Sequence, residues 1–544
     1  MTLNALLDEA SLRWPARIAL LVEEGPAHEH VSPCCRKRDV AGSEHAVAYD
    51  ELRCLVLRAA EAFRASGIAR GDRVAILHRN GLGFVVAYFG LLRLGAVAVP
   101  INFMVQKSSE LRYMLSDCGA RAIVTQRAFL REVNAARVGL AALETVWMTE
   151  GPCEGTRDFW AALADARTPQ CPKCGAGEDA EDAAAPDDVA AVLYTSGTTG
   201  EPKGVMLTHA NMVANADSSI LFFDLSENDV FLCLLPMFHT FAWTACIVLP
   251  LRIGAKVVVV TSITPPKPWL MRMARHGVTC FFAVPQLYAV LAKQATGLKR
   301  WVLRWYVFRK VRFCVAGAAP LPERVSRDFL RAVGHEILEG YGLTETSPIV
   351  SVNRPGRSRR GSAGPPIDGV SLRIVDGQGC ELPPGEEGEI CVRGHNIMKG
   401  YLNRPEDTRA VLSEDGWLRT GDVGIVDADG FLHIRDRIKD MIIIKGLKVF
   451  SAQVEAAILE HPGVQEAAVV GIPDDVGDET IKAFVVLRPG SKATKSDLLQ
   501  HCRQRLDPYK RPRDIEVLGE MPKNSLQKVL KRELRRRELD RRVS

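Results

Sequence analysis

Residues 194–204 read Tyr194-Thr195-Ser196-Gly197-Thr198-Thr199-Gly200-Glu201-Pro202-Lys203-Gly204 and follow an apolar run at 189–193 that predicts a buried strand. The glycines allow backbone N–H groups to approach an anion, the hydroxyl side chains add donors, and Lys203 adds a positive charge. This chemistry suits a polyphosphate. Gly200 is followed by Glu-Pro-Lys-Gly, so the spacing is not that of a Walker loop and disfavours the kinases and ATPases of that class. The alternative is a Ser/Thr/Gly-rich surface turn.

The composition is that of a folded protein with more than one domain. The chain has 544 residues, too many for a single core, with 47% apolar and 25% charged residues. The formal net charge is only +5, which implies no global field for a polyanion. The basic stretch at 523–544 carries no base-stacking pattern, so we expect no nucleic-acid partner.

Cysteine usage and the start of the chain favour a reduced, cytoplasmic setting. The fourteen cysteines form no disulfide framework, and residues 1–14 carry acidic side chains and no apolar signal core. No apolar run reaches the roughly 18 residues of a membrane span. Cys171 and Cys174 form half of a zinc site; either they bind no metal, or the site is completed by Cys34, Cys35, His28 and His30.

The chain alternates helical and strand-like patterns, which predicts parallel sheets flanked by helices. The polar segment 24–44 is interpreted as a surface insertion, and 175–188 as a mobile loop. Residues 361–435 contain short strands punctuated by turns and predict a smaller β-rich subdomain. From 441 onward, strands and helices form a compact α+β module. The expected N-terminal helices span 51–66 and 84–94, and the expected strands include 73–77, 96–100, 230–235, 257–260 and 313–316.

Further motifs carry residues suited to nucleotide chemistry. His239 lies in an apolar segment, where a histidine is commonly a core residue. Tyr341 is flanked by glycines and could lie flat on a base, while Thr344 and Glu345 could hold a phosphate oxygen and Mg²⁺; an ordinary turn is the alternative. Asp422 follows a Thr-Gly turn and could accept hydrogen bonds from two ribose hydroxyls, although such turns are common.

In this order, these segments resemble the adenylate-forming superfamily of acyl-CoA synthetases, adenylation domains and luciferases. The match runs from about 49 to 536, with the greatest likeness to fatty-acid–CoA ligases. The resemblance implies an α/β fold with a large N-terminal domain of parallel-type sheets, a β-rich subdomain at about 361–435, and a small C-terminal α+β domain. The implied domains are 1–438 and a mobile 439–544, with Lys439 as the hinge.

The resemblance also implies the substrates and the roles of individual residues. ATP and CoA would be co-substrates, with Mg²⁺ bound by Glu345. The phosphates would contact the loop Thr195, Ser196, Gly197, Thr198, Thr199, Gly200 and Lys203, and Thr344 would touch the α-phosphate. The adenine would be lined by Gly317, Ala318, Ala319, Glu339, Gly340, Tyr341 and Gly342, and the ribose held by Asp422 and Arg437. His239 would gate or line the acyl pocket, Gly446 would let pantetheine pass, and Lys528 would bind the carboxylate and the phosphate.

The implied reaction joins a carboxylate to AMP and then transfers the acyl group to the CoA thiol. Lys528 and Mg²⁺ would neutralise charge on the α-phosphate, and no protein nucleophile is needed. Two positions depart from the family pattern. Gln527 stands where a glycine usually precedes the lysine, and Ser451 stands where proline is frequent.

An apolar acid is the expected substrate. No Asp or Glu lies between 239 and 256 to pair with the ammonium of an amino acid, and the segment is rich in apolar residues. A medium- or long-chain fatty acid is favoured over an aryl acid. Two other functions are weighed against a CoA ligase: an enzyme that passes acyl-AMP to an acyl carrier protein, and a binding protein without turnover. The compact spacing from Glu345 to Asp422 disfavours the former, and intact site residues disfavour the latter.

A basic and aromatic stretch at 299–312 allows two interpretations. It could be an interfacial patch that contacts the inner membrane surface peripherally, where a fatty substrate enters. It could instead be an ordinary surface helix with a buried aromatic stripe.

Overall fold

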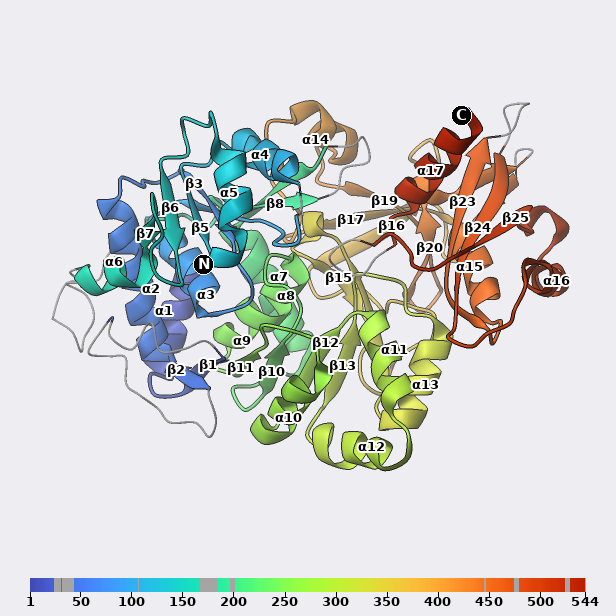
Figure 1. Ribbon diagram of the computed structural model, residues 1–544, viewed down its shortest axis with the longest axis horizontal. Helices are drawn as coiled ribbons and strands as arrows, with labels where there is room; N and C mark the ends of the chain where they lie inside the picture. Colours follow the sequence, from blue (N-terminus) through green and yellow to red (C-terminus); the bar gives the residue numbers. More distant parts are fainter. Residues whose placement is uncertain are drawn as a thin grey trace.

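The computed structural model describes residues 1–23, 31, 44–105, 107–166, 183–195, 201–444, 447–473, 479–523 and 529–543 (Figure 1). The described part contains two large mixed sheets, a four-stranded antiparallel sheet and a smaller C-terminal module.

The first large sheet has eight strands and is parallel except at its two edges. Apart from Lys256, which begins β11 and is half-buried, its central strands are short, buried apolar runs, as expected for strands covered on both faces. Their order is β15 (Ile349–Val352), β14 (Ile337–Gly342), β13 (Phe313–Ala316), β12 (Cys280–Ala283), β10 (Val230–Cys233), β11 (Lys256–Val259), β1 (Ile18–Val22) and β2 (His45–Ala48).

The second large sheet also has eight strands, and it contains the two strands that flank the polar loop. The hairpin of β8 and β9 is antiparallel, and the remaining strands from β8 onward run parallel. Their order is β18 (Gly400–Tyr401), β9 (Lys203–Thr208), β8 (Val189–Thr195), β4 (Val97–Pro100), β3 (Arg73–Leu77), β5 (Ala122–Thr125), β6 (Thr145–Met148) and β7 (Arg157–Asp158).

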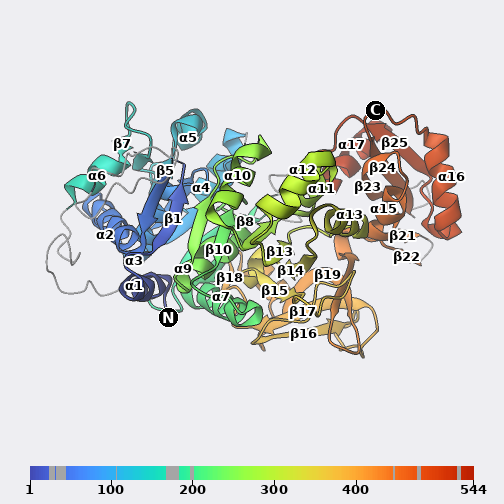
Figure 2. The same cartoon turned by 90° about the horizontal axis from the view of Figure 1, so that it is seen from below.

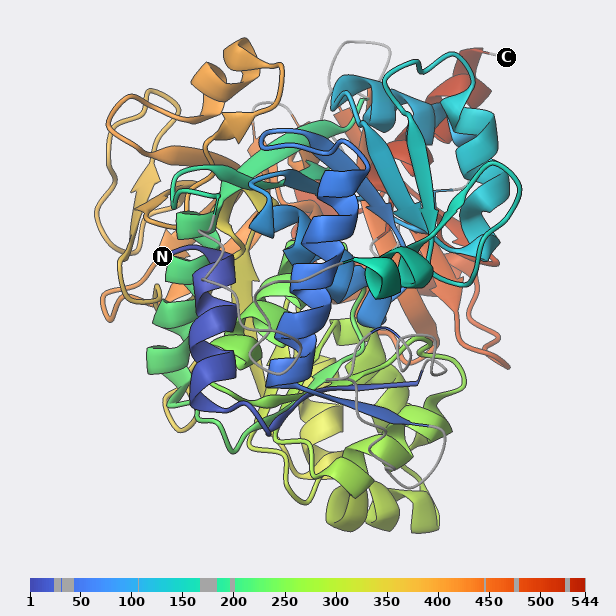
Figure 3. The ribbon, with the colours of Figure 1, turned by 90° about the vertical axis from the view of Figure 1, so that its left-hand side faces the viewer.

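Helix α3 (Leu82–Arg93) joins the two large sheets into one core. Every residue of α3 is buried, and the helix packs on β3 and β4. Its Tyr88 ring lies 4.0 Å from the ring of Trp243 in α8 (Thr240–Trp243), which follows β10 of the other sheet. Helix α1 (Leu3–Arg13) lies beside α2 (Tyr49–Ala65) and α7 (His209–Phe223) (Figure 3).

The remaining helices surround these sheets or belong to the C-terminal part. They are α4 (Ser108–Asp117), α5 (Leu130–Arg137), α6 (Phe159–Asp165), α9 (Leu249–Arg252), α10 (Pro266–His276), α11 (Pro285–Gln294), α12 (Gly297–Val302), α13 (Glu323–Val333), α14 (Pro405–Val411), α15 (Ser451–Leu459), α16 (Lys495–Arg505) and α17 (Lys531–Val543). Short 3₁₀ or π turns are η1 (Arg127–Phe129), η2 (Thr244–Val248), η3 (Leu303–Val307), η4 (Thr344–Thr346), η5 (Ile438–Asp440) and η6 (Pro508–Lys510).

The predicted β-rich region forms a four-stranded antiparallel sheet in the order β16 (Val370–Val375), β17 (Gly388–Gly394), β19 (Leu418–Val426) and β20 (Leu432–Arg437) (Figure 2). One strand of this region lies elsewhere. β18 pairs with β9, because the outer edge of β9 offers backbone groups that Gly400 and Tyr401 satisfy. The region therefore reaches into the sheet that carries the polar loop.

The C-terminal module has its own apolar cores, formed by residues from 442 to 534. A short hairpin of β21 (Ile442–Ile444) and β22 (Leu447–Val449) precedes a sheet of β23 (Val464–Pro473), β24 (Glu479–Leu487) and β25 (Asp514–Leu518). Helices α15 and α17 pack on β23, and α16 contacts β25 (Figure 1). The predicted fold, a large α/β part followed by a small α+β part, is confirmed.

Several expectations fall wholly or partly outside the described residues. They include most of the insertion at 24–44, positions 175–182 of the loop, and the metal candidates Cys34, Cys35, His28, His30, Cys171 and Cys174. Within the described residues, no cluster of His, Cys, Asp or Glu could hold a metal ion. The described cysteines are free thiols. Among the described helices, none has the length and apolar character required to cross a bilayer.

Candidate active site

The polar loop connects the paired ends of β8 and β9. Thr195 lies opposite Lys203 in the ladder, so the two ends of the loop are held together by the hairpin. Five predicted phosphate contacts between them lie outside the described residues: Ser196, Gly197, Thr198, Thr199 and Gly200.

Lys203 points toward two residues that sequence reasoning missed. Its Nζ lies 3.0 Å from Asp407 Oδ1 at the start of α14 and 5.1 Å from the ring centroid of Tyr401. The side chain is only 12% exposed. A carboxylate and an aromatic face together stabilise a cation that is largely withdrawn from water. No local pattern relates Asp407 or Tyr401 to the loop, because both are about two hundred positions away in the chain.

Glu345 contacts Tyr401, the same side chain that lies beside Lys203. The hydroxyl of Tyr401 donates a hydrogen bond to Glu345 Oε1 at 3.0 Å, while Oε2 has no partner among the described residues. Glu345 lies in η4, immediately after β14, and its carbonyl accepts from Met398 N at 2.9 Å. Burial and the neighbouring Glu345 charge raise the pKa of Tyr401, so the phenol remains a donor. Lys203 and Glu345 therefore both contact one aromatic side chain.

A second polar group lies where β14 meets the four-stranded sheet. The Tyr341 hydroxyl donates to Asp422 Oδ2 at 2.7 Å, and Arg437 Nε lies 3.0 Å from Asp422 Oδ1. Asp422 and Arg437 are direct partners in the β19–β20 ladder, so this ion pair follows from strand register. Burial raises the pKa of Tyr341, which keeps the hydroxyl protonated.

A cavity of about 280 Å³ opens beside this group and is lined by Thr420, Gly421, Asp422, Arg437, Ile438 and Lys439. Lys439 lies in η5, directly after β20. Burial and the adjacent Arg437 charge lower the pKa of Lys439. The predicted hinge residue thus lies at the wall of the cavity that holds the predicted ribose ligands.

Glycines create close approaches along the predicted adenine wall. Gly317 and Ala318 follow β13, next to β14, which carries Glu339 and Gly340. A Cβ at Gly342 would lie 1.9 Å from Pro348 O, so only glycine fits there. A Cβ at Gly317 would lie 3.2 Å from the Phe241 ring. The Phe241 segment and the end of β13 are therefore in direct contact.

His239 precedes α8 and is half-buried against Phe238, with 4.2 Å between the ring centroids. Burial lowers the pKa of His239 to about 3, so the ring is neutral near pH 7. Thr344 begins η4, beside Glu345. Two further predicted residues, Gly446 and Lys528, lie outside the described residues.

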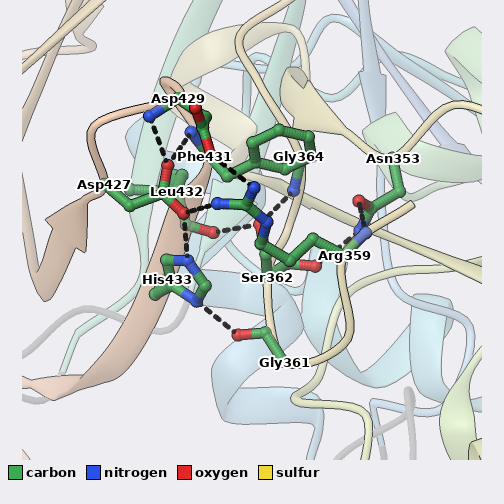
Figure 4. Close-up of polar contacts among 10 residues, drawn as sticks. All are labelled: Asn353, Arg359, Gly361, Ser362, Gly364, Asp427, Asp429, Phe431, Leu432 and His433. Atoms are coloured by element: carbon green, nitrogen blue, oxygen red, sulfur yellow. Dashed lines mark hydrogen bonds and ion pairs between the residues drawn. The ribbon is translucent and has the colours of Figure 1, made fainter. Parts of the chain in front are cut away.

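A second cavity of about 280 Å³ is lined in part by Glu339 and by the loop at 353–362. Glu339 Oε1 accepts from Leu321 N at 3.1 Å, and burial raises the pKa of this carboxyl to about 7. Figure 4 shows how the loop is fastened to the β19–β20 turn. Arg359 forms ion pairs with Asp427 and Asp429, and His433 Nε2 lies 2.9 Å from Asp427. These ion pairs hold the loop at 353–362, which forms one wall of the cavity, against the β19–β20 turn.

Comparisons with known proteins agree with this arrangement. The AMP-binding enzyme family model matches residues 23–402, and the model of the AMP-binding enzyme C-terminal domain matches 453–528. The chain is 34% identical over 505 residues to a long-chain-fatty-acid–CoA ligase of Bacillus subtilis, covering 88% of each chain. It is 36% identical over 526 residues to a feruloyl-CoA synthase of an Amycolatopsis species, covering 96% of this chain and 98% of the relative.

Among solved structures, the anthranilate CoA ligase AuaEII in complex with anthranoyl-AMP superposes with a TM-score of 0.85 at 28% identity, covering 99% of this chain and 97% of that one. Fold and site together define a two-part nucleotide-binding protein. The chain belongs to the AMP-binding enzyme family.

Proposed function

We propose that this protein is an AMP-forming acid–CoA ligase that activates an apolar carboxylic acid. The observation that carries the proposal is that Lys203 and Glu345 both contact Tyr401. These contacts bring the end of the polar loop close to the segment that contains Thr344 and Glu345. That grouping supplies a cation for polyphosphate and a carboxylate for a metal ion at one place. The names of the relatives, CoA ligases of fatty and aromatic acids, support the thioester product.

ATP would bind along the sheet edges from the loop to the four-stranded sheet. Residues 195–203 would hold the β- and γ-phosphates, Thr344 the α-phosphate, and Asp422 with Arg437 the ribose. The wall from Gly317 and Ala318 to Gly342 would enclose the adenine, with Tyr341 stacked on it and Glu339 and Gly340 beside it. The hydrogen bond from Tyr341 to Asp422 would hold base and sugar contacts in fixed relation.

Mg²⁺ fits the residues that are present. Glu345 offers an oxygen with no partner among the described residues, and Mg²⁺ is commonly bound by one or two carboxylates together with substrate phosphates. When bound, the ion would neutralise charge that develops on the phosphates. Tyr401 would orient the carboxylate through its hydrogen bond, and Lys203 would exchange Asp407 for a phosphate oxygen.

The C-terminal part would serve two half-reactions in turn. With domains at 1–438 and 439–544 and Lys439 as the hinge, Lys528 would contact the carboxylate and phosphate during adenylation. After rotation, the face that carries Gly446 would admit the CoA thiol. A carrier protein could replace CoA as the acceptor, and an assay with both acceptors separates the two.

The acid would be apolar because the chain between His239 and Lys256 offers no carboxylate for a substrate ammonium. A medium- or long-chain fatty acid is the first candidate, in line with the Bacillus relative. An aryl acid is the second. Phe241 packs edge-on to Phe282 at 6.2 Å between centroids, which provides an aromatic wall, and the feruloyl-CoA synthase matches nearly the whole chain.

The test is pyrophosphate release over a panel of fatty and aryl acids, with CoA, with a carrier protein and with neither. Acid-dependent release and a CoA thioester product are expected. The assignment would be contradicted if none of the acids in the panel caused pyrophosphate release, or if the product formed only on the carrier protein.

Two substitutions test the domain roles. Lys528→Ala should abolish adenylate formation yet leave thioester formation from supplied acyl-AMP largely intact, whereas the exposed Lys492→Ala in the same module should change neither. Lys439→Pro should damage one half-reaction more than the other. Equal loss of both rates with Lys528→Ala would refute its role, and normal rates with Lys439→Pro would refute the hinge.

A further inference from the structure

The helical segment formed by α12 and η3 exposes large apolar side chains on one face. Leu298, Trp301 and Trp305 are 77%, 59% and 61% exposed, and their spacing of three and four residues places them along one side of the helix. The opposite side, with Leu303, Val307 and Phe308, is buried. Of the two interpretations of this stretch, the buried aromatic stripe is therefore wrong for both tryptophans.

This segment also concentrates positive charge. Lys299, Arg304, Arg309 and Lys310 are exposed, and none of them forms an ion pair with a described residue. Arg304 lies over the Trp305 ring at 5.2 Å, and Arg309 lies over the Tyr306 ring at 5.9 Å. We call the surface formed by Leu298, Lys299, Trp301, Arg304, Trp305, Tyr306, Arg309 and Lys310 the α12 patch.

The charge of the patch stands out because the surrounding chain lacks acids. No Asp or Glu occurs from 230 to 322. Other arginines in that stretch form ion pairs with acids outside it. Arg252 pairs with Asp217 at 2.9 Å, Arg272 with Glu23 at 2.8 Å, and Arg312 with Asp229 at 2.7 Å. The cations without an ion-pair partner among the described residues thus gather in the same exposed segment as the tryptophans.

The neighbouring surface continues this character. Helix α10 packs against η3, contains no acidic residue and exposes Met271 and Lys267. Figures 1 and 2 place α12 at an outer edge of the molecule, beside α11 and α13. On α13, Asp328 lies 3.5 Å from Arg324, so that carboxylate already has a cation of its own. An outer edge with exposed tryptophans can contact a flat surface without rearrangement of the fold.

We propose that the α12 patch docks this protein peripherally on an anionic lipid bilayer. Tryptophan side chains favour the boundary between headgroups and acyl chains, because their rings are apolar and their N–H groups are polar. Lysines and arginines beside them attract anionic headgroups, and their stems extend along the apolar surface. The combination of both within one short exposed segment matches interfacial binding rather than insertion. The inference goes beyond the proposed ligase activity and does not depend on it.

The test is co-sedimentation of the full chain with vesicles of phosphatidylcholine alone and of equal parts phosphatidylcholine and phosphatidylglycerol. We expect binding to the anionic vesicles at about 0.1 M salt, where charges act over about 10 Å, and weaker binding at about 1 M salt, where that distance is about 3 Å. The double substitution Trp301→Ala with Trp305→Ala should weaken vesicle binding by about tenfold or more. Lys299→Glu with Lys310→Glu should remove the preference for anionic vesicles.

Matched controls lie on other surfaces. Leu221→Ala replaces a side chain that is 74% exposed on α7, and Tyr509→Ala replaces an exposed aromatic residue next to a lysine in the C-terminal module. Both should bind vesicles as the unaltered chain does. Because the patch tryptophans are exposed, the melting temperature of each variant should be unchanged, which excludes misfolding.

A second measurement reads the contact directly. Brominated lipids should quench tryptophan fluorescence of the unaltered chain, and the quenching should be largely lost in Trp301→Phe with Trp305→Phe, although binding persists. The proposal is overturned if the alanine variant binds anionic vesicles as well as the parent, or if neutral and anionic vesicles bind alike. It is also overturned if the patch substitutions alter only the oligomeric state, since the surface would then join protein copies.

Discussion

Ser451 Oγ donates a hydrogen bond to Asp436 Oδ2 at 2.8 Å, which links helix α15 of the C-terminal module to strand β20 of the four-stranded sheet. The same hydroxyl accepts from Lys531 Nζ at 2.7 Å, and Lys531 pairs with Glu455 at 2.7 Å. Asp436 directly precedes Arg437 in β20. A serine at a position where the family often has proline thus connects the terminal module to the strand that carries a predicted ribose ligand.

Ser451→Ala should destabilise this connection. Ser451 is fully buried, and its loss leaves both Asp436 and Lys531 with one partner fewer. Hydrogen bonds to charged groups contribute about 1.5–3 kcal/mol, so we expect a loss of about 2 kcal/mol in the free energy of unfolding. Urea titration followed by circular dichroism measures it. Ser496→Ala, at an exposed site in α16, is the control. An unchanged midpoint for Ser451→Ala would show that the network contributes no stability.

Tyr401→Phe removes the donor to Glu345 but keeps the ring beside Lys203. If Tyr401 orients the carboxylate for the metal ion, kcat/KM for pyrophosphate release should fall by about tenfold, equivalent to about 1.4 kcal/mol, and the requirement for Mg²⁺ should rise. Titration of Mg²⁺ under steady-state turnover measures both. Tyr509→Phe, at an exposed tyrosine far from the site in sequence, should leave both unchanged. A variant with normal Mg²⁺ dependence would contradict the orienting role.

Gly317→Ala should place a methyl group against Phe241, because its Cβ would lie 3.2 Å from that ring. We expect overpacking to cost about 1–3 kcal/mol, seen as a higher KM for the acid or a lower melting temperature. Phe241→Leu should relieve the contact. The loss in the double variant should therefore be smaller than the sum of the losses in the two single variants. A double-mutant cycle in KM and melting temperature measures this coupling. Strict additivity would mean that the two residues do not interact.

Glu339→Gln tests the raised pKa of this half-buried carboxyl. In the folded protein the pKa lies near 7 and the usual value is 4.5, so the folded state binds more protons in this window. The contribution of Glu339 to the stability of the parent should be fully present below the usual value and should be lost as pH rises through 7. The glutamine variant keeps an oxygen to accept from Leu321 N and carries no charge. The free energy of unfolding of the variant, relative to that of the parent, should rise by about 3 kcal/mol between about pH 4 and about pH 8. Melting temperatures of parent and variant at both pH values measure this difference. A difference between parent and variant that does not change with pH would contradict the titration of Glu339 in this range.

Much of the fold could be predicted because its signals are local. The helices predicted at 51–66 and 84–94 are α2 and α3, displaced by about two residues, and the strands at 73–77 and 313–316 are β3 and β13. Apolar runs and glycine stops mark such elements within a few residues. The pairing of β18 with β9 in the second large sheet was not predictable, because it depends on which strand edge of the folded protein is open for pairing.

The amino-acid sequence by itself determined the class of the fold, the order of the motifs and the residue types at the nucleotide site, because hydrophobic period, turn glycines and charge are properties of short segments. Tertiary structure alone decided that Asp407 and Tyr401 meet Lys203, that Ser451 joins two parts of the chain, and which face of α12 is exposed. Those relations depend on packing between segments that are far apart in the chain, which no short-range sequence pattern records.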